Sequence, residues 1–207
     1  MFSDPADRWH FSEDRNLAID FCVHVLILDG LHVAPFDAHP RRSQALDCPD
    51  LTETAWRKWL FDVVAGQGRI RDLTIKLAGK GSAPSTADRN EVLRLADPAG
   101  LWPGTGATAR RLADEWEHHR LLGESWRRDE MESQRHRGAA DHRSLWKRMS
   151  RFRDHLPPLS FFWVQYPAPA VCIVPPDSVV VGSPADETIT ARTSAFVQAA
   201  ESLQASI

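Results

Sequence analysis

Cysteine is scarce in this chain, and its placement excludes several classes of protein. Cys22, Cys48 and Cys172 lie far apart, so they form no CxxC pair of the kind found in zinc ribbons and redox proteins. An odd, scattered set also excludes the disulfide framework of a small secreted domain. The first ten residues, MFSDPADRWH, lack the basic start and apolar stretch of a signal peptide. We therefore expect reduced thiols in a cytoplasmic protein.

Long apolar runs and a strong charge of one sign are absent as well. No uninterrupted apolar stretch approaches the roughly 20 residues that cross a bilayer, so we expect no membrane partner. With 25 basic and 28 acidic residues the formal net charge is −3, which gives no whole-protein attraction for nucleic acid. Arginine outnumbers lysine 21 to 4, a bias that we interpret as the coding preference of a GC-rich bacterial genome.

The chain has enough apolar residues for a substantial core. Its 207 residues are 43% hydrophobic, which is typical of one globular domain, and we assign residues 1–207 to a single domain. Apolar residues alternate strictly from Leu17 to Ile27, the period of a half-buried strand. Asp29 and Gly30 follow, and this dipeptide favours a tight turn, so residues 31–36 are predicted to return as the second strand of a hairpin.

The rest of the chain alternates between helical and strand patterns. Helices are predicted at about 52–65, 86–96, 107–135 and 141–153, and from about residue 186 to the end. Strands are predicted at 159–166, 170–174 and 178–181. Residues 69–78 fit the period of a strand and that of a helix, and we favour the strand. These patterns predict an α+β fold, in which the N-terminal hairpin and the C-terminal strands form an antiparallel or mixed sheet of about 4–6 strands packed by helices. The central segment 105–155 is expected to be largely helical.

The predicted hairpin gathers five ionisable residues on one face. If Asp29 and Gly30 form the turn, Cys22 faces Asp37, Asp20 faces His39, and His24 shares their face because side chains alternate along a strand. Directly opposite Cβ atoms in such a pair lie within about 5.5 Å of each other. The pattern therefore predicts a compact polar cluster at the open end of the hairpin.

Two chemistries suit this cluster, and ordinary packing is the third alternative. Asp20, His24, Asp37 and His39 could hold a divalent metal that activates water, as in a hydrolase. Cys22 could instead act as a nucleophile, with His24 and Asp37 as its catalytic partners. A small cysteine on a strand is more often a buried packing residue, and polar residues are common where a hairpin frays.

The helical segment offers two further candidates. Glu115 and His119 have the i, i+4 spacing of a metal-binding helix face, although no HExxH motif is present. GTGATA at residues 104–109, followed by Arg110 and Arg111, could hold an anion at a helix start, but the strand that precedes a dinucleotide-binding turn is missing. A nucleotide or nucleic-acid binder is therefore the weakest alternative.

Arginine and tryptophan recur together on the long central helix. These residue types are over-represented where protein interfaces gain their binding energy, and Arg120, Trp126, Arg127 and Arg128 are the predicted contact residues. The leading interpretation is a soluble bacterial interaction or regulatory module without evident catalysis, whose partner is another protein. A metal-dependent or thiol-dependent enzyme on the hairpin is the alternative.

Overall fold

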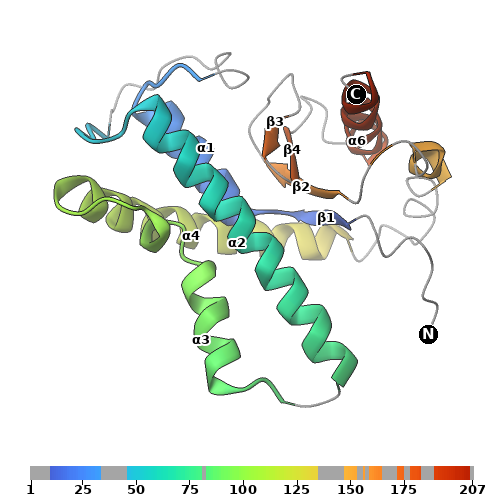
Figure 1. Ribbon diagram of the computed structural model, residues 1–207, viewed down its shortest axis with the longest axis horizontal. Coiled ribbons are helices and arrows are strands. Elements are labelled where there is room, and N and C mark those ends of the chain that lie inside the picture. The colour runs from blue at the N-terminus through green and yellow to red at the C-terminus, as the bar shows by residue number, and fades with distance from the viewer. Residues whose placement is uncertain are drawn as a thin grey trace. The chain divides into compact units, whose positions relative to one another are not determined.

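The computed structural model describes residues 10–33, 46–80, 83–134, 147–152, 156, 159–164, 172–174, 178–182 and 189–205. These residues form the helices and strands labelled in Figure 1. The helices are α1 (Leu17–Leu28), α2 (Glu53–Lys80), α3 (Thr86–Leu95), α4 (Ala107–Gln134) and α6 (Ile189–Gln204), with short 3₁₀ turns η2 (Ala99–Leu101) and η3 (Ser150–Phe152). The strands are β1 (His10–Arg15), β2 (Ser160–Val164), β3 (Cys172–Val174) and β4 (Ser178–Gly182). They form two compact units, residues 17–119 and the described residues outside that range.

The predicted N-terminal hairpin is wrong, because its first strand is the helix α1. Nearly every residue of α1 is buried, so the helix is apolar on all sides and its alternating pattern does not distinguish strand from helix. Gly30 has φ 68°, and the backbone N–H of Leu31 donates to the carbonyl oxygen of Leu26 at 3.1 Å. This is the glycine-ended closure of a helix C-terminus. The Asp-Gly signal therefore ends a helix instead of turning a hairpin.

Helix α2 is about twice as long as predicted, and it replaces the strand expected at 69–78. Gly66 does not end the helix. A Cβ atom at Gly66 would lie 3.3 Å from Leu95 Cδ2, so the glycine allows α3 to approach closely. Beyond it, Ile70, Leu73 and Leu77 have the spacing of a helix face and are half-buried. Thr52 caps the start of the helix, because its Oγ1 accepts a hydrogen bond from the backbone N–H of Ala55.

The 17–119 unit is built on tryptophans of α2. Trp56 and Trp59 are fully buried, and each indole N–H donates to a backbone carbonyl, Trp56 to Cys22 at 2.8 Å and Trp59 to Pro98 at 2.7 Å. These two bonds connect α2 to α1 and to the η2 turn, while α3 packs on the second half of α2 (Figure 1). Buried aromatic rings thus supply both apolar contact and specific orientation.

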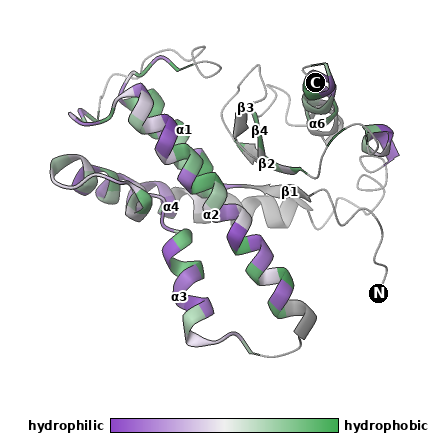
Figure 2. Ribbon diagram, viewed as in Figure 1, coloured by the Kyte–Doolittle hydropathy of each residue, from purple (hydrophilic) through white to green (hydrophobic). Residues whose placement is uncertain are grey.

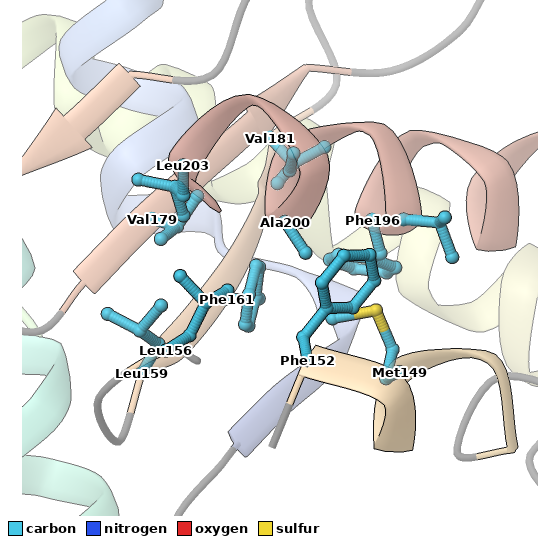
Figure 3. Close-up of a cluster of buried hydrophobic side chains, with 12 residues drawn as sticks. Met149, Phe152, Leu156, Leu159, Phe161, Val179, Val181, Phe196, Ala200 and Leu203 are labelled. Carbon is cyan, nitrogen blue, oxygen red and sulfur yellow. The ribbon is translucent and has the colours of Figure 1, made fainter. Parts of the chain in front are cut away.

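The other unit contains a small sheet with strand order β1-β2-β4-β3. β1, β2 and β4 run parallel, and β3 joins β4 antiparallel. Phe161 of β2 and Val179 and Val181 of β4 pack against Phe196 and Ala200 of α6 (Figure 3). The sheet takes no strand from the predicted hairpin, and helices account for most of the described residues. The predicted α+β fold, with its sheet of about 4–6 strands including the hairpin, is therefore wrong: the residues that the structure describes are mostly helical.

Several elements are confirmed. The predicted helices at 86–96 and 107–135 are α3 and α4, and the last helix is α6. The three C-terminal strands are β2, β3 and β4, each shorter than or close to its predicted length. Most of the helix predicted at 141–153 lies outside the described residues. Among the described residues, no helix combines the length and the apolar character that a bilayer crossing requires.

Candidate functional site

The helical form of α1 separates the residues that the hairpin would have gathered. Successive helix positions rotate by 100°, so Asp20 and His24 share one side of α1 while Cys22 points about 160° away from both. Asp37 and His39, the other two predicted ligands, lie outside the described residues. Among the residues that the structure describes, no group of three or more His, Cys, Asp or Glu side chains could hold a metal ion.

Cys22 is a packing residue in this structure. Its side chain is fully buried, and burial raises the pKa of the thiol well above its ordinary value, with the nearby Asp20 carboxylate raising it further. The nucleophilic form of cysteine is the thiolate, which these two effects disfavour. Cys48 is also buried, and burial together with Asp29 raises its pKa to about 11. Neither Cys22 nor Cys48 has the environment of a reactive thiol.

The structure does join His24 to a carboxylate, but the carboxylate comes from α4. Nε2 of His24 donates to Oε1 of Glu115 at 2.8 Å, across 91 residues of sequence. Both side chains are partly shielded, with 12% of His24 and 25% of Glu115 exposed. A carboxylate only accepts hydrogen bonds, so this contact fixes the tautomer and the orientation of the His24 ring. It also ties α1 to α4.

His119 completes the cluster, one helical turn beyond Glu115 on α4. Its ring centroid is 4.9 Å from that of His24 and 5.5 Å from that of Phe21, and Trp116 lies alongside at 6.3 Å. Only 3% of His119 is exposed, and burial, with smaller effects from His24 and His118, lowers its pKa to about 3. His119 Nε2 has no hydrogen-bond partner among the described residues. The ring is therefore neutral near pH 7.

This arrangement is a histidine–carboxylate pair inside an aromatic core. Such a pair can orient an imidazole for proton transfer or for metal binding, as it does in many enzymes. Here the second imidazole stacks on aromatic rings, and no third metal ligand joins the group within the described residues. The geometry shows a polar contact that holds two helices in register. The sequence signal for it was the i, i+4 spacing of Glu115 and His119; nothing in the sequence indicated His24 as their partner.

The predicted contact residues of the central helix all lie on α4. Arg120 is half-buried, and the side chains of Trp126, Arg127 and Arg128 lie outside the described part of the chain. Their role in binding stays a prediction. Arg111, one of the two arginines proposed for anion binding, lies at the start of the same helix. Its guanidinium donates a hydrogen bond to the backbone oxygen of Leu46 and so connects α4 to the segment before α2.

A different surface, which the sequence patterns had not indicated, runs along α2. Its members, which we call the outer row, are spaced by three or four residues and are exposed except for the half-exposed Gly68. They are Phe61, Ala65, Gly68, Asp72 and Ile75. At 100° per residue they fall within a sector of about 80° on the side of α2 opposite the buried core face. The heptad spacing of positions 61, 68 and 75 was the signal that could have found them.

The outer row carries two of the large apolar side chains that the described residues expose to solvent. Phe61 is 38% exposed and Ile75 is 61% exposed, and a Cβ atom at Gly68 would meet nothing within 4 Å. Figure 2 shows hydrophobic segments on α2 interleaved with hydrophilic ones. On a helix with one buried face, the opposite face is ordinarily charged or polar, but Asp72 is the one charged member of this row.

Comparisons with known proteins give no relative: no protein-family model, no curated protein and no solved structure matches this chain.

Proposed function

We propose that this chain is a protein-interaction or regulatory module of the bacterial cytoplasm, and that it binds another protein through the outer row of α2. The observation that supports the proposal is the apolar character of the row, on the side of α2 that the core does not use. Exposed apolar residues that gather on one surface are typical of interaction sites, whereas single exposed ones are ordinary. The free thiols of Cys22 and Cys48 suit a reducing compartment.

The folding of α2 does not account for the outer row. Trp56, Trp59 and Val63 are buried on the opposite side of the helix, whereas Phe61 keeps 38% and Ile75 keeps 61% of its surface exposed. An apolar side chain left in water contributes nothing to the free energy of unfolding through burial. The row therefore leaves apolar surface in water that folding of the unit does not bury, which is the pattern of a surface kept for a partner.

The structure gives no support to the alternative of a thiol-dependent enzyme that uses Cys22. Burial and the raised pKa of Cys22 oppose a thiolate nucleophile, and His24 is bound to Glu115 and not to a cysteine. A metal-dependent hydrolase that uses Asp37 and His39 would depend on residues outside the described ranges. No observation on the described residues favours it over the interaction module.

The test compares partner recovery by matched variants. Tagged wild-type protein and a Phe61→Glu/Ile75→Glu variant are recovered from bacterial cells that encode the chain, and the bound proteins are quantified. We expect a stoichiometric partner on the wild type and its loss from the double variant, with thermal midpoints within a few degrees of each other because both positions are exposed. Leu93→Glu is the control, since Leu93 is 69% exposed but lies on α3.

Two results would contradict the proposal. One is a partner that the double variant retains as well as the wild type does. The other is a partner lost equally from the Leu93→Glu control, because that loss would show general sensitivity to an added charge. Loss of the fold in the double variant, measured by circular dichroism, would also contradict the proposal, because it would show that folding itself requires these two apolar side chains.

A further inference from the structure

We propose that the outer row binds an amphipathic helix of another protein whose flanking positions are acidic. This inference rests on the proposed function and names the chemistry of the partner. It follows from three properties of α2: the charge of the helix, the apolar centre of its outer row and the small side chains in the middle of that row.

Helix α2 is basic in a chain that is acidic overall. Within Glu53–Lys80 there are six basic residues and three acidic ones, a local net charge of +3, whereas the whole chain carries −3. Four of the bases border the outer row and are exposed: Arg57, Lys58, Arg69 and Lys76. Charges around the rim of an interface select a partner of opposite sign and speed its association.

Three of the bases near the row form ion pairs at the surface. Arg57 pairs with Glu53 at 3.0 Å, Lys58 with Asp62 at 2.8 Å and Arg69 with Glu91 at 2.7 Å, and these three basic side chains are 48%, 64% and 65% exposed. Exposed ion pairs of this kind are worth roughly 0–1 kcal/mol, so an acidic partner can share or replace them at little cost.

The middle of the row suits the close approach of a second helix. Ala65 and Gly68 lie between Phe61 and Ile75, and the space above Gly68 is open. Two helices pack closest where the side chains at the crossing are small, and larger apolar residues on either side then cover the contact. A partner helix with an apolar stripe would bury Phe61 and Ile75 together, over about four turns of α2.

The same observations disfavour two other occupants. A second copy of this chain would bring two α2 helices of charge +3 together. A nucleic acid would place phosphates over the row, where the central residues are apolar and Asp72 is acidic, while phosphate-binding surfaces place bases at the centre of contact. The apolar centre with a basic rim fits an acidic amphipathic helix better than either.

The experiment selects peptides that bind the protein from a library that varies in the charge of the flanking positions. A displayed library of 21-residue helical peptides has a fixed leucine stripe, and its flanking positions vary among Glu, Gln and Lys. Peptides are selected on the full-length wild-type protein, and those that also bind Phe61→Glu/Ile75→Glu are removed. We expect Glu to be enriched over Lys at the flanks by several fold. Flanks that stay random, or that become enriched in Lys, would overturn the inference.

The enriched peptide is then measured by fluorescence anisotropy against charge variants. Arg69→Glu/Lys76→Glu should weaken binding roughly tenfold, and added salt should weaken binding to the wild type. Lys147→Glu/Arg148→Glu reverses two exposed bases that do not belong to α2 and should leave binding unchanged. Equal weakening by both pairs of reversals would show a general charge effect and would contradict a site at the outer row.

The competing occupants give separate outcomes. Sedimentation that shows a wild-type dimer, lost in Phe61→Glu/Ile75→Glu, would identify a second copy and overturn the acidic-helix inference. Binding of duplex DNA that the same variant abolishes would overturn it in favour of nucleic acid. A cellular partner that depends on the outer row but contains no acidic helix would refute this inference alone and leave the proposed function in place.

Discussion

Acid should destabilise this protein through His119, and the size of the effect follows from its burial. In the folded state the pKa of His119 is lowered to about 3 because the ring is buried among aromatic side chains, against an ordinary value of 6.5. As pH falls below 6.5, the unfolded chain binds a proton at this position while the folded chain does not. The contribution of the neutral His119 to the free energy of unfolding is therefore fully present above pH 6.5, and it is lost progressively as pH falls toward 3.

Each pH unit in this window is worth about 1.4 kcal/mol, so His119 alone should remove about 3 kcal/mol between pH 6.5 and 4.5. His119→Leu replaces the ring with an apolar side chain that does not titrate, and its free energy of unfolding should fall by about 3 kcal/mol less over the same interval. The measurement is urea unfolding followed by circular dichroism at several pH values, because the comparison of slopes cancels any change in packing.

His118→Leu is the matched control, since His118 is the exposed neighbour of His119 on the same helix. Burial is the main cause of the lowered pKa of His119 and His118 is a minor one, so this variant should change the pH dependence much less than His119→Leu does. Parallel pH curves for the wild type and His119→Leu would refute the argument, because they would show that the folded protein accepts the proton at this position as easily as the unfolded chain does.

The remaining predictions concern α2, which carries the outer row, and α3, which packs on it. Gly68→Ala should raise the free energy of unfolding by about 0.5–1 kcal/mol, since a Cβ atom there meets nothing and alanine favours the helix, whereas Gly66→Ala should gain less because its Cβ atom would press on a leucine of α3. Trp56→Phe should cost about 1–3 kcal/mol, because it removes the buried hydrogen bond from the indole N–H to the carbonyl of Cys22 and leaves a smaller ring in the core. Ser85→Ala should cost about 1 kcal/mol by removing the capping box of α3. Chemical unfolding measures all four, and a Gly66→Ala gain equal to that of Gly68→Ala, or a neutral change at Trp56 or Ser85, would contradict these assignments.

The sequence predicts the helices α3 and α4 correctly but not α1, and the difference has a physical reason. α3 and α4 are amphipathic and exposed on one side, so their period of 3.6 residues is visible, and proline and glycine mark their ends. The buried helix α1 shows no such contrast, since both of its sides are apolar. A run of alternating β-branched and aromatic residues there fits a strand equally well, and only the tertiary contacts decide.

The error at α1 explains the error at the site. Whether Asp20, Cys22 and His24 share a face depends entirely on the assumed period, because an alternation of two residues aligns them and a helix separates Cys22 from the others. The pairing of His24 with Glu115 depends in turn on how two helices pack across 91 residues, which no local pattern contains. Residue types were sufficient to indicate where ionisable groups occur, but their partners were set by the fold.

The ionisable residues that the sequence offers as catalytic or metal-binding candidates make packing contacts or hydrogen bonds inside the 17–119 unit. Cys22 and His119 are held in protonation states that suit packing, the neutral thiol and the neutral imidazole, and Glu115 is occupied by His24. Each of these contacts stabilises the fold, so none requires a ligand to explain it. The outer row has the opposite property, since Phe61 keeps 38% and Ile75 keeps 61% of its apolar surface exposed, and folding does not bury that area. A surface that folding does not explain is a better guide to function than a reactive residue that folding does explain, and for this reason the proposals place binding on α2.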